Sequence, residues 1–336
     1  MKQLISLWFV TTAMALPAQQ VWLQGGDVLA GSVTAVKDNR VQIRGSDGAL
    51  RQLPVRQVDR EVAADGSVRR FAAAAREGEL TPPERALLQQ VGRGAELGVP
   101  ELVAATDRPS TALLAALRER LHDDREAAQI AAAQALAATA VPDAVRAALA
   151  AAVERRSERM LAAVAAASTS GAQLGALAEA DAGDLIARGF AAREAVTRFT
   201  MAWIGVQLEV EGAQPVLAKF VRDRDHHRRE AAAMALAEHG NDVGAAVLLT
   251  IARRERAPVQ QANRDADAAT RAFVDRLALR ERCRACELLG ALRHEPALPA
   301  LERLSHADDV DLAAAARAAV AAIRDGAGAV SGDRDR

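Results

Sequence analysis

Cys283 and Cys286 are the only cysteines of the chain, and they form a C-x-x-C pair. On a helix, residues i and i+3 lie on one face, so the two thiols could form a local disulfide or perform redox chemistry in an oxidising compartment. A four-thiolate zinc site would need a second cysteine pair, which the sequence lacks. Both cysteines fall where neighbouring helices carry small packing residues. We therefore predict packing cysteines, with a local disulfide and then redox or metal chemistry as the alternatives.

Histidines and aspartates gather in three short charged segments. A metal site would need converging ligands, and the adjacent His226 and His227 point in different directions at the start of a helix. Aspartate before a helix caps free backbone N–H groups and suits the positive end of the helix dipole. We therefore predict turns and helix caps, with Asp223 or Asp225 as the cap, and no metal or cofactor site. The three segments are LHDDRE (121–126), RDRDHHRRE (222–230) and SHADDVD (305–311).

Two other features could bind a partner. Trp203 is the only tryptophan of the helical region, and it serves either as a core anchor or as a binding hot spot. Much of the chain repeats a pattern of alanine-rich helices, and residues 252–280 interrupt that repeat. Insertions on one face of a repeat array often carry function. Within this insertion Arg253, Arg254 and Arg256 are candidate contacts.

Several enzyme and nucleic-acid signatures are missing from the sequence. It has no P-loop, no H-E-x-x-H and no G-x-S-x-G motif. The 43 basic residues nearly balance the 44 acidic ones, so the net charge of −1 gives no general attraction to nucleic acid. We therefore expect a protein that is not an enzyme, has no cofactor and does not bind nucleic acid.

The first eighteen residues follow the secretory pattern, because Lys2 precedes an apolar run and small residues end it. Cleavage is expected after Ala15 or Ala18. The alternative is a buried N-terminal helix. We predict a signal peptide at 1–18, and hence an exported, periplasmic or extracellular protein that is not inserted in a membrane after cleavage.

Residues 19–66 differ from the rest of the chain in residue pattern, because apolar and β-branched residues alternate there and two turn-forming segments separate them. We predict four or five short antiparallel strands, with turns at residues 37–40 and 45–48. The segment GDVLAG (26–31) resembles the strand pair that opens small SH3-like barrels of exported, planctomycete-type proteins. That resemblance implies either peptide binding or packing against a neighbour.

Internal repeats dominate the rest of the chain. AAAQALA (131–137) recurs as AAAMALA (231–237), each after an apolar helix and an aspartate-containing turn. Around residues 282–304 the sequence resembles the short HEAT-like repeats also found in phycobilisome lyases. The resemblance implies an α-solenoid of six or seven helix pairs, whose second helices line a concave face.

The predicted organisation is thus a mainly α protein, an α-solenoid preceded by a small antiparallel β-barrel-like module. We expect a linker with a short helix at 67–100, the repeats at 101–326 and a disordered tail at 327–336. The expected function is that of an exported, non-enzymatic scaffold that binds a protein or peptide on the concave face. The alternatives are a bilin-lyase-like enzyme or chaperone, and a protein that binds cell-envelope polymer through the β module.

Overall fold

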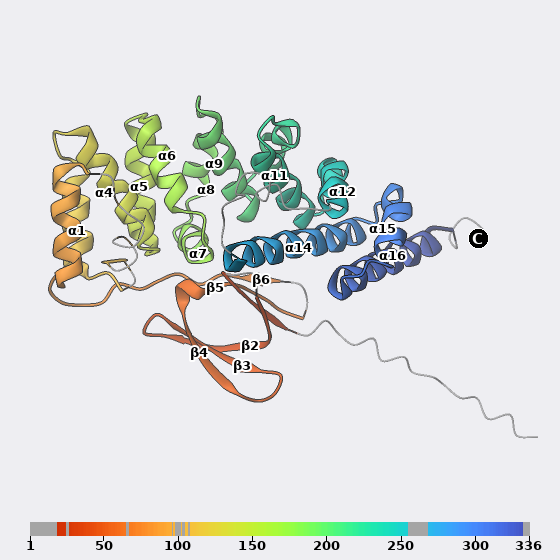
Figure 1. Cartoon of the computed structure of the whole chain (residues 1–336). Coiled ribbons are helices and arrows are strands. Elements are labelled where there is room, and N and C mark those ends of the chain that lie inside the picture. The colour runs from red at the N-terminus through yellow and green to blue at the C-terminus, as the bar shows by residue number, and fades with distance from the viewer. Residues whose placement is uncertain are drawn as a thin grey trace, which may run out of the picture. The chain divides into compact units, whose positions relative to one another are not determined.

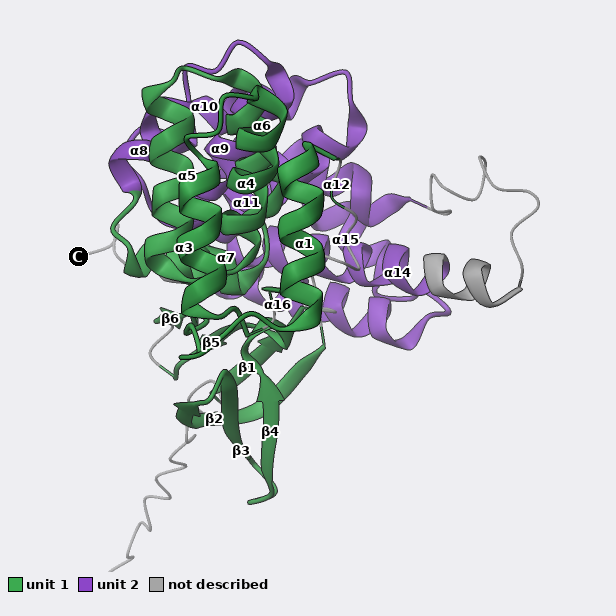
Figure 2. Ribbon diagram, turned by 90° about the vertical axis from the view of Figure 1, so that its left-hand side faces the viewer, with its two compact units in different colours: residues 1–182 green, residues 183–336 purple. Residues whose placement is uncertain are grey.

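The computed structural model describes residues 19–24, 27–64, 67–95, 97, 102, 105–106, 108–254 and 268–331, with 268–274 and 326–331 described by backbone alone. The predicted signal peptide, Gly26 and Arg256 lie outside the described residues. The chain forms two compact units, residues 1–182 and 183–336 (Figure 2). The fold is mainly helical with an N-terminal antiparallel sheet, as the sequence predicted.

The sheet of the first unit has six strands in the order β4-β3-β2-β1-β5-β6, all paired antiparallel (Figure 1). Both predicted hairpin turns are confirmed. Asp38 and Asn39 have φ angles of 53° and 57°, the conformation that a tight two-residue hairpin requires. The strands are β1 (Gln20–Leu23), β2 (Val28–Lys37), β3 (Arg40–Gly45), β4 (Leu50–Pro54), β5 (Val58–Val62) and β6 (Val68–Arg69).

Strand β2 changes its partner from β1 to β3 at Gly31. Gly31 has a φ of 154°, and a Cβ atom there would lie 2.3 Å from the carbonyl oxygen of Arg44. Only glycine therefore allows β2 and β3 to approach this closely at position 31. The module has an apolar core that includes Val41, Ile43 and Phe71.

The helices of the first unit pack as pairs, α3 against α4 and α5 against α6, and α4 also packs against α6. The short helix predicted within the linker 67–100 is present as α1 and contacts α3 and α4. Thr81 and Glu84 form a capping box that fixes its start. The helices are α1 (Pro82–Arg93), α3 (Thr111–Arg120), α4 (Glu126–Ala138), α5 (Pro142–Glu154), α6 (Glu158–Ala167) and α7 (Gly171–Glu179).

Helix α7 has the sheet as a packing partner. It contacts α5, strand β5 and the 3-10 turn η1 (Val55–Gln57). A Cβ atom on Gly171 would lie 2.3 Å from the carbonyl oxygen of Asp59, and one on Gly175 would lie 2.8 Å from the carbonyl carbon of Phe71. Ala172 of α7 belongs to the same buried cluster as Phe71. Of the two roles expected for the β module, the structure shows packing.

The second unit continues the pairing, with α8 against α9, α10 against α11, and α15 against α16. Alanines make up nearly half of its buried core, and leucine, valine and isoleucine supply most of the rest. The small alanines let the helices approach closely. The helices are α8 (Gly183–Gly189), α9 (Ala195–Gln207), α10 (Ala213–Ala218), α11 (His226–Glu238), α12 (Ala245–Arg253), α14 (Ala268–Ala291), α15 (Leu298–Leu304) and α16 (Val310–Ser331), with 3-10 turns η2 (Lys219–Arg222), η3 (Asp242–Gly244) and η4 (Glu295–Ala297).

Helix α16 runs to Ser331, so it includes residues 327–331 of the predicted tail. Two alanines in this stretch favour helix, Gly326 and Gly328 disfavour it, and no proline stops it. Residues 332–336 lie outside the described part of the chain.

No single helix in the described ranges is long and apolar enough to cross a membrane. Helices α6 and α7 pass that test only as a pair, by length and composition, and they are bent by 115° with respect to each other.

Candidate partner-binding surface

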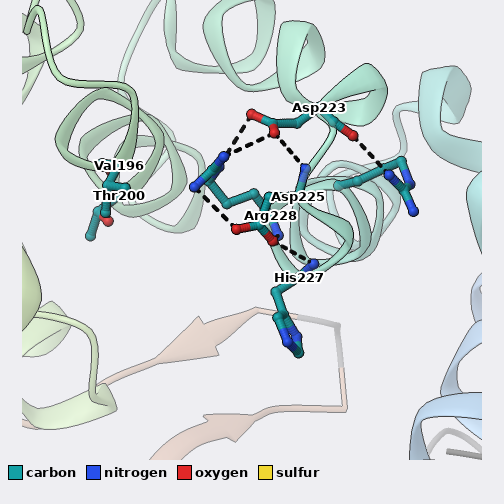
Figure 3. Close-up of polar contacts among 7 residues, drawn as sticks. Val196, Thr200, Asp223, Asp225, His227 and Arg228 are labelled. Carbon is teal, nitrogen blue, oxygen red and sulfur yellow. Dashed lines mark hydrogen bonds and ion pairs between the residues drawn. The ribbon is translucent and has the colours of Figure 1, made fainter. Parts of the chain in front are cut away.

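The charged segment 222–230 forms the turn before α11 and an ion-pair network (Figure 3). Arg228 donates to both carboxylate oxygens of Asp223, with Nη2–Oδ1 and Nε–Oδ2 distances of 2.9 and 3.2 Å. This guanidinium is the main reason why the pKa of Asp223 lies below its usual range. The turn is therefore held by charge pairing within the segment itself.

Asp225 is the N-cap of α11, which confirms the predicted capping role. Its Oδ1 accepts hydrogen bonds from the backbone N–H groups of His227 and Arg228, at 2.9 and 3.3 Å. Asp223 supports the cap, because its Oδ1 accepts from the backbone N–H of Asp225 at 2.8 Å. Hydrogen bonding from the Arg228 backbone lowers the pKa of Asp225, so the cap is charged at neutral pH.

The other two charged segments occupy the same place in their helix pairs. Asp309 accepts from the backbone N–H of Leu312 at 3.0 Å, at the start of α16. Asp123 instead holds the turn before α4, where it accepts from the backbone N–H of Arg125 at 3.1 Å and pairs with Arg120. Aspartate therefore stabilises all three turns, although at 121–126 it is not the N-cap.

The two adjacent histidines begin α11. Their ring centroids lie 3.9 Å apart at an angle of 37°; His227 is exposed, whereas Nε2 of His226 is buried without a hydrogen-bond partner. The described residues contain no group of three or more histidine, cysteine, aspartate or glutamate side chains that could hold a metal ion.

Arg253 and Arg254, two of the arginines expected to contact a partner, differ in their exposure to solvent. Arg253 is exposed at the end of α12. Arg254 is mostly buried and forms ion pairs with Glu230 of α11 and Glu281 of α14, the latter at 3.7 Å. Burial raises the pKa of Glu281, and Arg254 opposes that rise. Arg254 thus ties three helices together rather than presenting its charge to a partner.

Trp203 is partly buried on α9 and packs against the core of the second unit. Phe199, one turn earlier on the same helix, meets Phe220 edge to face, with ring centroids 5.3 Å apart. The structure therefore places Trp203 among packing residues, which is one of the two roles that the sequence allowed.

Cys283 and Cys286 are free thiols on α14. Cys286 is fully buried in the core of the second unit, and Cys283 packs against that core. Burial raises the pKa of Cys286 to about 12, so its thiol stays protonated and unreactive at neutral pH. These positions agree with the predicted packing role.

Sequence reasoning missed three exposed apolar side chains on the second helices of the second unit. Val196 of α9, Leu277 of α14 and Val310 of α16 are 51%, 41% and 75% exposed. Helices α9, α11, α14 and α16 contact one another in that succession. In Figure 3 Val196 and Thr200 lie on α9, the helix next to the Asp223–Arg228 network of α11. Val196 and Val310 both stand in the first turn of a helix, Val196 shortly after Arg193 and Glu194, and Val310 directly after Asp308 and Asp309. This position marks them in the sequence.

We define Val196, Leu277 and Val310 together with His227 as the second-helix row.

No protein-family model matches the chain, and no curated protein is similar to it in sequence. Among solved structures, the chain is similar to an engineered protein, with 18% identity and a TM-score of 0.40 over 63% of this chain and 97% of that one. It is also similar to human deoxyhypusine hydroxylase in complex with glycerol, with 14% identity and a TM-score of 0.31 over 72% of this chain and 96% of that one.

Proposed function

We propose that this protein is an exported, non-enzymatic scaffold of HEAT-like repeats that binds a protein or peptide partner through the second-helix row. The observation that supports this most is the exposure of Val196, Leu277 and Val310 on neighbouring second helices. Burying apolar side chains on association stabilises a complex by roughly 25 cal/mol per Å² of area removed from water, less the cost of association.

Polar and charged groups on α11 supply specificity. His227 is exposed on α11, and α11 contacts both α9, which carries Val196, and α14, which carries Leu277. Asp223 and Arg228 are held in place by their mutual ion pair, so they add a rigid polar border to the apolar positions. An apolar centre with a polar rim is the usual anatomy of a protein interface.

A matched set of variants tests the proposal. Val196→Asp and Val310→Asp place charges in the row, whereas Val243→Asp places one in the turn η3, at a valine that is 55% exposed and thus similar to Val196. The wild-type protein is used to capture and identify a partner from an envelope extract, and Kd is then measured for each variant. We expect the double variant V196D/V310D to weaken binding at least about tenfold, because desolvating a buried carboxylate disfavours the complex. Equal loss in V243D, or no loss in the double variant, would contradict the proposal.

The exported location has its own test. Expression of the full chain in a Gram-negative host, followed by intact-mass measurement, should give a mature protein that begins at Leu16 or Gln19 in the periplasmic fraction. Uncleaved protein confined to the cytosol would refute export.

A further inference from the structure

The first unit contains a cavity of about 460 Å³, and none of its lining residues belongs to the second-helix row. Its walls come from loops of the β module and the turn η1, from Leu102 and Thr106, from the C-terminal ends of α4 and α6 and from the start of α7. The volume falls within the range of roughly 300–1,000 Å³ that is typical of small-molecule and peptide pockets.

The polar groups of the cavity are neutral or positive. Gln24, Gln134 and Gln173 contribute carboxamides, Ser170 a hydroxyl and Arg56 a guanidinium. No carboxylate is among the described residues that line the cavity. The lining is therefore suited to a ligand that carries a negative charge or hydrogen-bonding amides.

Two of these groups are oriented by the chain and retain hydrogen-bonding capacity. Gln173 donates from Nε2 to the carbonyl oxygen of Ala138 at 3.3 Å, while its Oε1 is buried without a donor. Ser170 stands before α7 but makes no capping hydrogen bond with its side chain. An amide N–H of a ligand would satisfy Gln173 Oε1, and the Ser170 hydroxyl can donate to an anionic oxygen.

The rest of the wall is apolar and mostly made of small side chains. Ala138, Ala166, Ala167 and Ala172 line it together with Val55 and Leu102. Alanine leaves room between the helices, and a small or branched apolar side chain of a ligand would fill that room.

We propose that this cavity binds the carboxyl-terminal end of a peptide with small apolar side chains. The carboxylate lies toward Arg56 and Ser170, the last peptide N–H donates to Gln173 Oε1, and the terminal side chains contact the alanines. The proposal rests on the cavity alone and does not depend on the second-helix row.

The probes are acetyl-Ala-Ala with a free carboxylate and the same compound as its carboxamide. Binding to the full-length protein is measured by calorimetry and by protein-observed NMR. We expect the carboxylate to bind at least tenfold more tightly than the carboxamide. Ala166→Phe fills the cavity from an exposed position on α6 and should abolish binding, whereas Ala178→Phe, exposed on α7 and away from the lining, should not change it.

Circular dichroism and thermal unfolding establish that both variants are folded before binding is measured. Gln173→Leu removes the acceptor and provides a second variant, which should weaken binding of the carboxylate at least tenfold. The proposal is overturned if neither probe binds, if the carboxamide binds as well as the carboxylate, or if Ala166→Phe binds like the wild type.

Discussion

Helix α7 of the first unit and helix α12 of the second bury similar apolar faces against different structures. Helix α12 packs against the helices α11, α14 and α15. Helix α7 packs against α5 on one side and against strand β5 and the turn η1 on another. The apolar stripe of a repeat helix requires cover, but a curved sheet covers it as well as a helix does.

The contacts of α7 and of α12 share one feature, a small residue that lets two backbone segments approach closely. In the first unit Gly171 and Gly175 face the backbone of Asp59 and Phe71. In the second unit Gly244, just before α12, faces Ala233, where an added Cβ would lie 2.6 Å from the Cα atom. Close backbone approach, rather than the type of element, is thus what the two regions share.

The largest expected effect follows from truncating Phe71. Its side chain is 4% exposed, it belongs to the buried cluster shared by the sheet and α7, and Arg69 lies over its ring at 5.1 Å. Phe71→Ala should lower the free energy of unfolding by about 3–5 kcal/mol, as for other buried aromatic truncations. Hydrogen exchange should show that β5 and α7 lose protection together.

The matched variant is Phe220→Ala in the second unit, where the ring is 6% exposed. It should leave the protection of β5 and α7 unchanged. If Phe71→Ala opens the sheet but leaves α7 fully protected, then the sheet is an independent module and the comparison fails.

The second-largest effect is expected from adding one methyl group at the contact between α7 and the sheet. Alanine is favoured over glycine inside a helix, but a Cβ atom at position 175 would lie 2.8–3.0 Å from three backbone atoms of Phe71. Gly175→Ala should therefore destabilise by about 1–3 kcal/mol, as overpacking does. Gly183→Ala in α8 meets only Val210 Cγ2 at 3.7 Å and should be neutral or stabilising in the same denaturation experiment.

A pH-dependent effect is expected at the start of α1, where Glu84 links the N-termini of α1 and α3. Glu84 is 1% exposed; it accepts from the backbone N–H groups of Thr81 and Ser110, both at 2.6 Å, and pairs with Arg76 at 2.7 Å. Burial alone would raise its pKa, but the hydrogen bonds from Thr81 and Ser110 together hold it below the ordinary value. The charged form therefore stabilises the fold.

Glu84→Gln places a side-chain NH2 group against the backbone N–H donors of Thr81 and Ser110. It should lower the free energy of unfolding by about 1–3 kcal/mol at neutral pH. Because the folded-state pKa is depressed, this contribution is complete above the unfolded-state value of about 4.5 and is lost as pH falls through the folded-state value. Urea titrations of both proteins should give curves that converge as the solution is acidified. If the difference in the free energy of unfolding between the two proteins stays constant at all acidic pH values, then the charge of Glu84 does not stabilise the fold.

The smallest effects concern the turns that end the second helices. Glu209 after α9 has a φ of 56°, and Gly240 after α11 has a φ of 74°, both left-handed. Glu209→Gly relieves the steric cost of a side chain in this conformation and should stabilise by about 0.5–1 kcal/mol. Gly240→Ala should destabilise by a similar amount, since its Cβ would meet nothing within 4 Å and only the backbone is strained. Thermal unfolding of the two variants should shift in opposite directions.

Much of the local structure could be read from the sequence, because it depends on short-range chemistry. The hairpin at Asp38 and Asn39, the capping aspartate at 225 and the alanine-rich second helices all follow from conformational preference and hydrogen bonding within a few residues. The packing of Cys286 also followed from its register among alanines.

The remaining features depend on contacts between distant segments, and only the tertiary structure decided them. Periodicity cannot show that α7 packs against β5 or that Arg254 forms ion pairs with Glu230 and Glu281. Nor can it show that a cavity forms between loops of the β module and the helices α4, α6 and α7. A sequence determines which faces must be buried because each residue carries its own solvation and conformational cost. Which surface buries them is settled by packing, where the shapes of elements far apart in the chain either fit or clash.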